Sequence, residues 1–383
     1  MKKALALGTI VAAVAATAAS AMTRASSSQP TASAAGFAAC TSGQIGFLGP
    51  LTGAVAFLGK EQGNWAKYAV DSFNKANGTH FRIKNGDTQL NPKLALTVGT
   101  KFAADKSLLA TIGPAGSQEV IAVGKLFKRR GMPAISSSAT NVVLVDGRYP
   151  TFSRVVGNDS VQGFTDAMFM IQKLKAKKVV IIDDQEAYST GLATRASAVL
   201  RSHGVNVQRE SVNQKVTDFS SLVTKIGSDV NVVFLPWQVA ANGQLFAQQM
   251  KEQGKNAKIF GSDGLDSGDF TITGAYVSSF ARDIHGLPGT KSVIAGYNKK
   301  YGTKWSTFGP PAYVAAQVIA TAYKAACSDG KASRAELLKN IRAVNIPSSI
   351  LGLPIKFDKH GELKGAKFYV SVIQSNGKHK LVG

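Results

Sequence analysis

The sequence lacks the residues and motifs of most catalytic sites. Its 383 residues include two cysteines and five histidines. Two cysteines exclude a disulfide-dense scaffold and a zinc site built from four cysteines. No two glycines stand two positions apart, so the dinucleotide-binding pattern is absent, as are the phosphate-binding loop, the metalloprotease helix and the nucleophile elbow. We therefore expect no catalytic residues, no metal and no cofactor.

Long apolar runs are also missing, except at the N-terminus. Residues 1–21 predict a signal peptide, because two lysines precede an apolar run that ends at a small-residue cleavage site, Ala19-Ser20-Ala21. The alternatives are an uncleaved membrane anchor and a lipoprotein, although Cys40 lies about twenty residues too far along for lipidation. Residues 22–42, rich in serine, threonine and alanine, predict a flexible linker. We expect export to the periplasm or the extracytoplasmic face of the membrane.

Acidic residues are scarce, with 23 Asp and Glu against 45 Lys and Arg. Such a positive charge raises the possibility of a nucleic-acid partner. The basic residues, however, are mostly isolated or on helix faces, without the interleaved aromatic residues of a base-stacking surface. We read the charge as a solvated basic surface and expect no nucleic acid.

The two cysteines allow one disulfide. Cys40 precedes the first predicted strand, and Cys327 ends a long apolar helix. Export permits a bond between them, which would tie the N-terminal segment to the domain that it starts. The alternative is two unpaired thiols.

Short apolar strands alternate with helices along the whole chain. The first set of predicted strands covers residues 44–48, 81–85, 108–112, 133–135 and 152–156, and the second covers 178–182, 205–209, 230–235, 257–260 and 276–281. Strands separated by helices form parallel sheets with right-handed crossovers. The sequence therefore predicts an α/β protein with two doubly wound parallel-sheet lobes.

Ligands of such sheets bind beyond the carboxyl ends of the strands. Two hydroxyl-rich loops, 113–117 and 136–140, follow neighbouring predicted strands of the first set. Hydroxyls and a helix start suit a carboxylate, although a single serine more often only caps a helix. In the second set, Asp263 follows a strand and suits an ammonium group, the alternative being an aspartate in a turn. Residues 183–188 hold clustered acids, which we read as a solvated strand end in preference to a metal site.

Several of these segments resemble one family. They are residues 45–53 (IGFLGPLTG), 87–92, 135–141 (ISSSATN), 184–191 (DQEAYSTG) and 352–361. In this order they are similar to the periplasmic binding proteins of ABC transporters (type I fold), specifically the leucine/isoleucine/valine-binding branch. The resemblance runs from about residue 44 to the end of the chain.

The resemblance implies a set of ligand-binding residues. By position these are Ser117, Ser138 and Thr140 for the amino acid's charged groups, Asp263 for its ammonium group, Tyr188 at a strand end, and Leu58, Trp237 or Gln238, and Phe308 around its side chain. The sequence departs from the family at two of these positions. Asp263 is one methylene shorter than the frequent glutamate, and Trp237 or Gln238 stands where tyrosine is common.

The resemblance also implies two lobes joined by a three-segment hinge. Lobe one would comprise residues 43–156 and 287–346, and lobe two residues 158–283 and 353–383. The implied function is that of a monomeric substrate-binding protein that captures an amino acid, branched-chain or related. It would deliver this ligand to an ABC permease with its ATPase subunits. The alternative is a sensor or receptor of the same fold for amides, urea or aromatic acids, and the missing motifs disfavour an exported hydrolase.

Overall fold

The structure is a computed structural model that describes residues 42–327 and 330–383. All of these residues belong to one compact unit. The predicted signal peptide, nearly all of the predicted linker and Cys40 lie outside the described residues, so the predictions that concern them stay predictions. In the part of the chain that is described, no helix is both long and apolar enough to cross a membrane.

The first sheet has five strands in the order β2-β1-β3-β4-β5, and every neighbouring pair is parallel. The strands are β1 (Gln44–Gly49), β2 (Arg82–Asp87), β3 (Leu108–Ile112), β4 (Ala134–Ser136) and β5 (Phe152–Arg154). The helices between them are α2 (Ala56–Asn77), α3 (Pro92–Ala104) and α4 (Ser117–Arg130). This is the predicted doubly wound arrangement.

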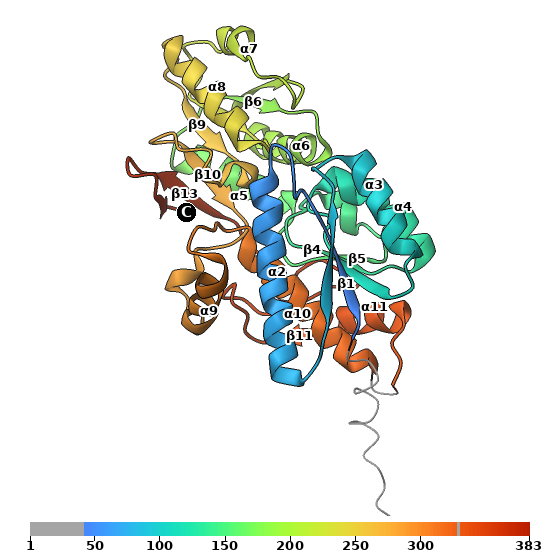
Figure 1. Cartoon of the computed structure of the whole chain (residues 1–383). Helices are drawn as coiled ribbons and strands as arrows, with labels where there is room; N and C mark the ends of the chain where they lie inside the picture. The colour runs from blue at the N-terminus through green and yellow to red at the C-terminus, as the bar shows by residue number, and fades with distance from the viewer. Residues whose placement is uncertain (1–41, 328–329) are drawn as a thin grey trace, which may run out of the picture. The chain divides into compact units, whose positions relative to one another are not determined.

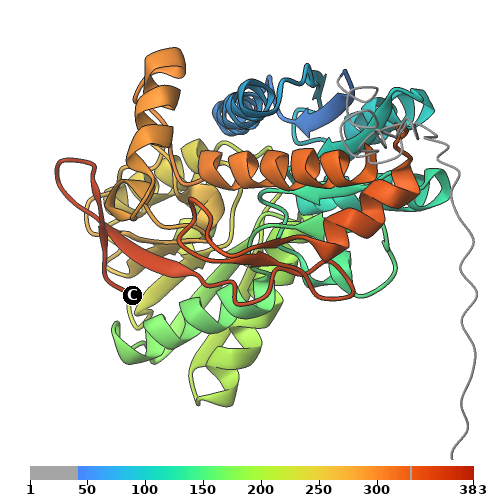
Figure 2. The ribbon, with the colours of Figure 1, turned by 90° about the horizontal axis from the view of Figure 1, so that it is seen from below.

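Helices cover both faces of the first sheet (Figure 1). Successive side chains of a strand point to opposite faces. Phe47 of β1 belongs to the core formed with α2 and α10 (Gly309–Ala326), whereas Leu48 belongs to the core formed with α3 and α4. Figure 2 shows α10, in orange, passing close to α2, in blue. A segment from late in the chain thus completes the first lobe, together with α9 (Lys291–Tyr301) and α11 (Arg334–Ala343).

The second sheet has seven strands in the order β14-β13-β10-β9-β8-β6-β7. Five of them are mutually parallel, as predicted: β6 (Lys178–Asp183), β7 (Asn206–Ser211), β8 (Val232–Leu235), β9 (Lys258–Gly261) and β10 (Tyr276–Ser279). The edge differs from the prediction, because β13 (Tyr369–Ile373) is antiparallel to β10 and to β14 (His379–Leu381). A short turn joins β13 to β14, and such a connection can link only antiparallel strands.

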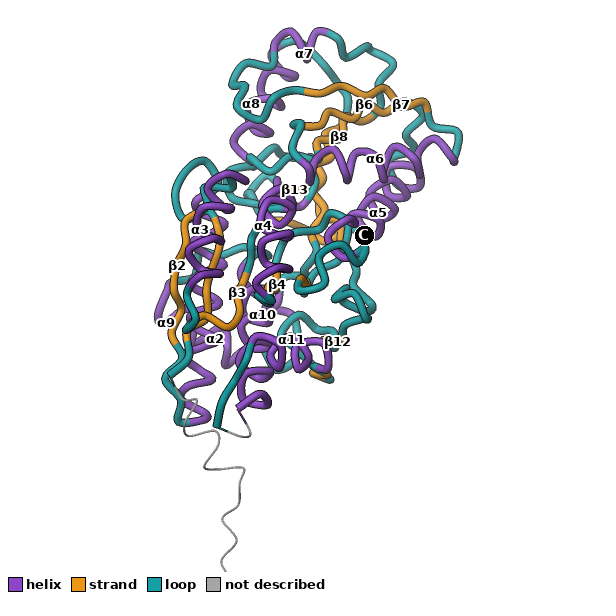
Figure 3. The backbone as a smooth tube through the Cα atoms, turned by 90° about the vertical axis from the view of Figure 1, so that its right-hand side faces the viewer, coloured by secondary structure: helices purple, strands orange, loops and turns teal. Residues whose placement is uncertain are grey.

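Helices also cover both faces of the second sheet. Figure 3 shows β6 and β8 between α8 on one side and α5 and α6 on the other. Val180 and Val233 accordingly pack in a core with α7 and α8, whereas their neighbours Val179 and Val232 pack in a core with α5 and α6. The helices are α5 (Asp159–Gln172), α6 (Ala187–Ser202), α7 (Ser220–Thr224) and α8 (Ala240–Glu252).

The remaining elements are short. Strands β11 (Asn345–Ile346) and β12 (Ile355–Lys356) form a small antiparallel sheet, and the 3-10 helices are η1 (Val142–Val145), η2 (Asp263–Leu265) and η3 (Ile284–Gly286). η2 follows β9 directly and carries Asp263 at its start. This placement puts the predicted ammonium partner at the carboxyl end of a parallel strand.

Candidate functional site

A pocket lies where the strand-end loops of the two sheets face each other. Its lining residues come from both lobes: Leu58, Leu90, Ala115, Ser117, Ser138, Tyr188, Gln238, Asp263, Gly264 and Phe308. Seven of the nine sequence-predicted residues are among them, Leu58, Ser117, Ser138, Tyr188, Gln238, Asp263 and Phe308. Thr140 and Trp237 do not line it, and Leu90, Ala115 and Gly264 were not predicted. Contact of these residues with a ligand stays a prediction.

Two close backbone approaches shape this pocket. A Cβ on Gly59 would lie 2.1 Å from the carbonyl oxygen of Pro50, so only glycine lets the first turn of α2 come this close to the loop after β1. That turn carries Leu58. A Cβ on Gly264 would likewise lie 2.1 Å from the carbonyl oxygen of Trp237. Glycine at both positions therefore lets two segments of the same lobe pack closely beside the pocket, once in each lobe.

The first lobe contributes hydroxyl groups. Ser117 is the first residue of α4, and its Oγ accepts a hydrogen bond from the backbone N–H of Asn141 at 3.2 Å. Ser117 does not cap this helix, because Gly116 occupies the N-cap position and its N–H donates to the Glu119 carboxylate at 2.8 Å. The Ser117 hydroxyl hydrogen is thereby left to donate elsewhere. Ser138 Oγ donates to the carbonyl of Ala115 at 2.8 Å, which holds the two hydroxyl-rich loops together.

The second lobe contributes a buried carboxylate. Asp263 is 4% exposed, and its Oδ1 accepts hydrogen bonds from Tyr188 Oη and from Gln162 Nε2, both at 2.5 Å. Burial raises the pKa of Asp263 to about 6, although these two hydrogen bonds oppose the shift. Asp263 is therefore largely ionised at neutral pH but lacks a cationic partner in these two contacts. That combination suits an ammonium group of a ligand.

A polar chain continues from Asp263 into the second lobe. Gln162 Nε2 also donates to Ser278 Oγ at 3.1 Å, and Ser278 Oγ donates to Asp166 Oδ2 at 3.1 Å. Burial raises the pKa of Asp166 well above its usual value and that of Asp159 to about 7. Sequence reasoning missed these residues of α5, because a polar helix face turned inward has the same spacing as one turned to water. Among the described residues, no group of three or more potential metal-binding side chains could hold an ion.

Contacts between the lobes surround the pocket. Gln118 Nε2, from α4, donates to Gln238 Oε1 of the second lobe at 2.9 Å. Leu90 of the first lobe packs with Val239 of the second in a small apolar cluster. Thr307 Oγ1 donates to Asp266 Oδ2 at 2.5 Å. Together these contacts bring the two lobes against each other over the pocket.

Trp237 and Thr140 have other surroundings. Trp237 is 2% exposed, its indole N–H donates to the carbonyl of Ile182 at 2.7 Å, and its ring packs against Phe219 and Phe246 in the core of the second lobe. Of the two alternatives at this position, Gln238 therefore lines the pocket and Trp237 does not. Thr140 is completely buried, and its hydroxyl faces the Asp159 carboxylate and partly opposes the rise in the pKa of Asp159.

These placements predict different effects for two neighbouring substitutions. Trp237→Phe should lower the free energy of unfolding by about 1–3 kcal/mol, because the Ile182 carbonyl loses its donor, while ligand affinity stays within twofold. Gln238→Leu should weaken ligand binding while leaving the melting temperature nearly unchanged. Calorimetric titration and thermal unfolding of both variants test this. If Trp237→Phe keeps normal stability but loses ligand binding, Trp237 contacts the ligand and this placement is wrong.

Cys327 lies buried at the C-terminal end of α10. Because Cys40 lies outside the described residues, the bond between Cys40 and Cys327 stays a prediction.

Comparison with known proteins agrees with this architecture. Residues 43–378 match the family described as "Periplasmic binding protein". An "Amino acid binding protein" of Pseudomonas aeruginosa is 29% identical over 326 residues, which cover 82% of this chain and 85% of the relative. A "Leucine-, isoleucine-, valine-, threonine-, and alanine-binding protein" of the same organism is 28% identical over 317 residues, covering 80% of this chain and 83% of the relative.

Among solved structures, the branched-chain amino acid transporter substrate binding protein LivJ from Streptococcus pneumoniae, in complex with isoleucine, is similar. It superposes with a TM-score of 0.80 at 25% sequence identity, over 89% of this chain and 99% of that protein. The family match spans most of the chain and both of its sheets. The chain belongs to the periplasmic binding protein family.

Proposed function

We propose that this protein is the extracytoplasmic substrate-binding protein of an ABC transporter and that it captures an amino acid, branched-chain or related. The observation that carries the proposal is the division of polar groups between the two sides of the pocket. The Ser117 hydroxyl, which accepts one hydrogen bond and can donate another, lies on one lobe beside Ser138, and the buried carboxylate of Asp263 lies on the other. A zwitterion needs donors opposite its carboxylate and an anion opposite its ammonium group.

The apolar lining supports a ligand with an aliphatic side chain. Leu58, Leu90 and Phe308 line the same pocket as the polar groups and are buried. Burial of apolar ligand surface against such residues stabilises the complex by roughly 25 cal/mol per Å². Relatives named for binding leucine, isoleucine and valine are consistent with this preference.

We also propose that the protein binds its ligand without transforming it. The lining residues include no histidine, cysteine or lysine, and the one lining carboxylate, Asp263, hydrogen-bonds the Tyr188 hydroxyl rather than a serine that could act as a nucleophile. The partners would be a membrane permease and its ATPase subunits, with the binding protein itself a monomer. The two lobes, 43–156 with 287–346 and 158–283 with 353–383, would close on the ligand about their three connecting segments.

The experiment that tests this function is a binding screen on the mature protein. Amino acids are compared with short amides, urea and aromatic acids by thermal shift, and hits are titrated calorimetrically. A ligand at 100 times its dissociation constant adds about 2.7 kcal/mol of stability. We expect leucine or a related amino acid to bind, and 4-methylpentanoate, which lacks the amine, to bind far more weakly. Binding of an aromatic acid or urea, with no amino acid binding, would refute the proposal.

Export is tested separately. We propose periplasmic or extracytoplasmic location, with cleavage of the signal peptide after Ala21. Intact mass of material recovered from outside the cytoplasm should correspond to a chain that starts at Met22. A mature chain that still begins at Met1 would contradict the cleavage.

A further inference from the structure

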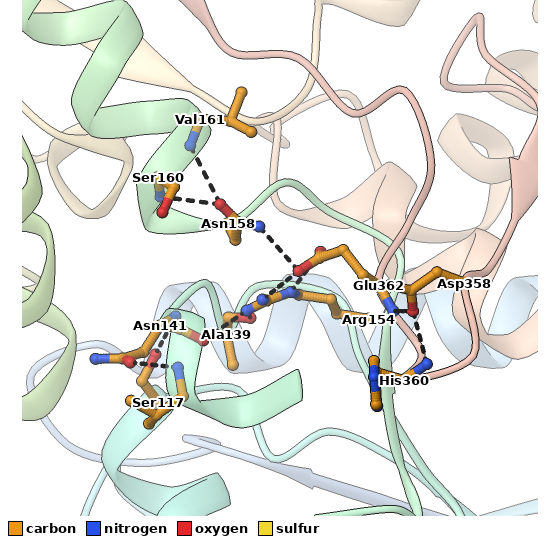
Figure 4. A network of polar contacts seen from close by, with 11 residues as sticks. Ser117, Ala139, Asn141, Arg154, Asn158, Ser160, Val161, Asp358, His360 and Glu362 are labelled. Carbon is orange, nitrogen blue, oxygen red and sulfur yellow. Dashed lines mark hydrogen bonds and ion pairs between the residues drawn. The ribbon is translucent and has the colours of Figure 1, made fainter. Parts of the chain in front are cut away.

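An ion pair of two residues far apart in the chain lies where the two lobes are connected. Arg154, the last residue of β5, is completely buried. Its Nε donates to Glu362 Oε1 at 2.8 Å and its Nη2 to Glu362 Oε2 at 2.6 Å (Figure 4). Two parallel hydrogen bonds of this kind fix both distance and orientation.

The third nitrogen of Arg154 reaches one of the pocket loops. Its Nη1 donates to the carbonyl oxygens of Ala139 at 3.2 Å and Asn141 at 2.8 Å. These residues directly follow Ser138, which lines the pocket. The backbone N–H of Asn141 in turn donates to Ser117 Oγ, and its side-chain amide donates to the carbonyl of Ala187, next to Tyr188. The guanidinium therefore holds a loop that contacts Ser117 of the pocket and, in the second lobe, the residue before Tyr188.

Glu362, in the lobe-two segment 353–383, connects the same loop to the start of α5, which directly follows the first connection between the lobes. Its Oε2 also accepts from Asn158 Nδ2 at 2.9 Å, and Asn158 Oδ1 caps the first turn of α5. The backbone N–H of Arg154 donates to the carbonyl of Gly361 at 3.1 Å. Figure 4 shows Asn158 beside Glu362, with Ala139 and Asn141 on the other side of Arg154. One carboxylate thus joins the segment after β5 to the segment before β13.

We propose that Arg154 and Glu362 are positioning residues: the ion pair holds the 138–141 loop of lobe one in its ligand-binding geometry and couples it to lobe two beside the connection between the lobes. A buried ion pair is by itself weak evidence of stabilisation, because desolvation offsets much of the attraction. An apolar pair of equal volume would fill the space but would leave two buried loop carbonyls without donors. The guanidinium is therefore suited to ordering this loop. The proposal rests on the proposed function, since it takes the loop to face the ligand.

The test compares Arg154→Lys with a control at a second ion pair. Lysine can reach Glu362 with one nitrogen, but it cannot also supply the donors that the carbonyls of Ala139 and Asn141 now have. The control is Arg209→Lys, since Arg209 binds Asp183 at 2.8 Å between neighbouring strands of the second sheet, away from this loop. Ligand affinity, thermal stability and hydrogen exchange of the ligand-free loop peptide are measured for both variants and for Glu362→Gln.

We expect Arg154→Lys to accelerate exchange in residues 136–145 by tenfold or more and to weaken ligand binding by ten- to a hundredfold. Glu362→Gln keeps one acceptor oxygen, so it should also accelerate loop exchange and weaken ligand binding, but by smaller factors than Arg154→Lys. Arg209→Lys should lower the melting temperature without changing the hydrogen exchange of the loop or the ligand affinity. If Arg154→Lys and Glu362→Gln lower only the melting temperature, the pair is a structural contact and the proposal is wrong. Loop exchange is measured without ligand, so it tests this inference even if wild-type protein binds no amino acid.

Discussion

Replacement of Asp263 by asparagine is expected to weaken amino acid binding by about thirty-fold to several-thousand-fold. The substitution preserves the shape of the side chain and removes its charge. Asp263 is 4% exposed, and the two groups that bind it, Tyr188 and Gln162, are both uncharged. A ligand ammonium group would then be desolvated opposite a neutral amide. Loss of one member of such a buried charged pair costs about 2–5 kcal/mol, which corresponds to the stated range.

The matched control is Asp269→Asn, on the same loop but exposed. It removes the same charge from the protein without touching the pocket lining, so its affinity should stay within about twofold of wild type, as expected for a screened surface charge. Calorimetric titration of both variants with the tightest ligand decides the matter. If Asp263→Asn binds as tightly as wild type, the ligand carries no ammonium group at this position, and an uncharged or purely anionic ligand becomes the better hypothesis.

The sequence predicts those parts of the site whose position follows from the direction of the strands and from local signals at helix starts. In a parallel sheet the strand-end loops gather at one edge, so the loops that carry Ser117 and Ser138 could be placed together from the strand pattern, whereas the two residues themselves were named from the family resemblance. Helix α3 begins where the sequence carries a start signal, because Asn91 accepts from two backbone N–H groups and Pro92 occupies the first turn. Each of these signals is local, which is why a sequence pattern records it.

The parts that were missed depend on contacts between distant segments. Arg154 and Glu362 are 208 positions apart, and only the folded chain shows that they meet. Gln162 and Asp166 are polar residues at ordinary helical spacing, and nothing in the sequence distinguishes their inward face from a solvated one. The antiparallel edge of the second sheet follows from the path of the last connecting segment, which no periodicity encodes.

Acidification from pH 8 to pH 5 is expected to raise the thermal stability of the ligand-free protein and, at the same time, to weaken ligand binding. Burial raises the pKa of Asp159 to about 7 and that of Asp263 to about 6, both from 3.8. Between 3.8 and these values the folded state holds more protons than the unfolded state, so the free energy of unfolding increases as the pH falls. His379, whose pKa is raised by its hydrogen bond with Asp266, changes stability in the same direction.

Binding should respond with the opposite sign, because a ligand ammonium group pairs with the ionised form of Asp263. Below about pH 6 the ionised fraction of Asp263 falls about tenfold per pH unit, and affinity should fall with it. Moderate salt in the titrations screens the surface charges, whose repulsion also grows on acidification.

Two variants separate these effects. Asp166→Asn removes a buried titratable group that does not line the pocket and whose Oδ1 has no hydrogen-bond partner among the described residues. It should raise the melting temperature at pH 8 by several degrees, because folding then no longer requires residue 166 to be buried as a charge or to take up a proton. It should also flatten the dependence of stability on pH. Asp263→Asn should instead abolish the dependence of affinity on pH. If the melting temperature of the wild-type protein falls steadily from pH 8 to pH 5 in moderate salt, these carboxylates are already ionised in the folded state, and the polar chain behind Asp263 holds no proton at neutral pH.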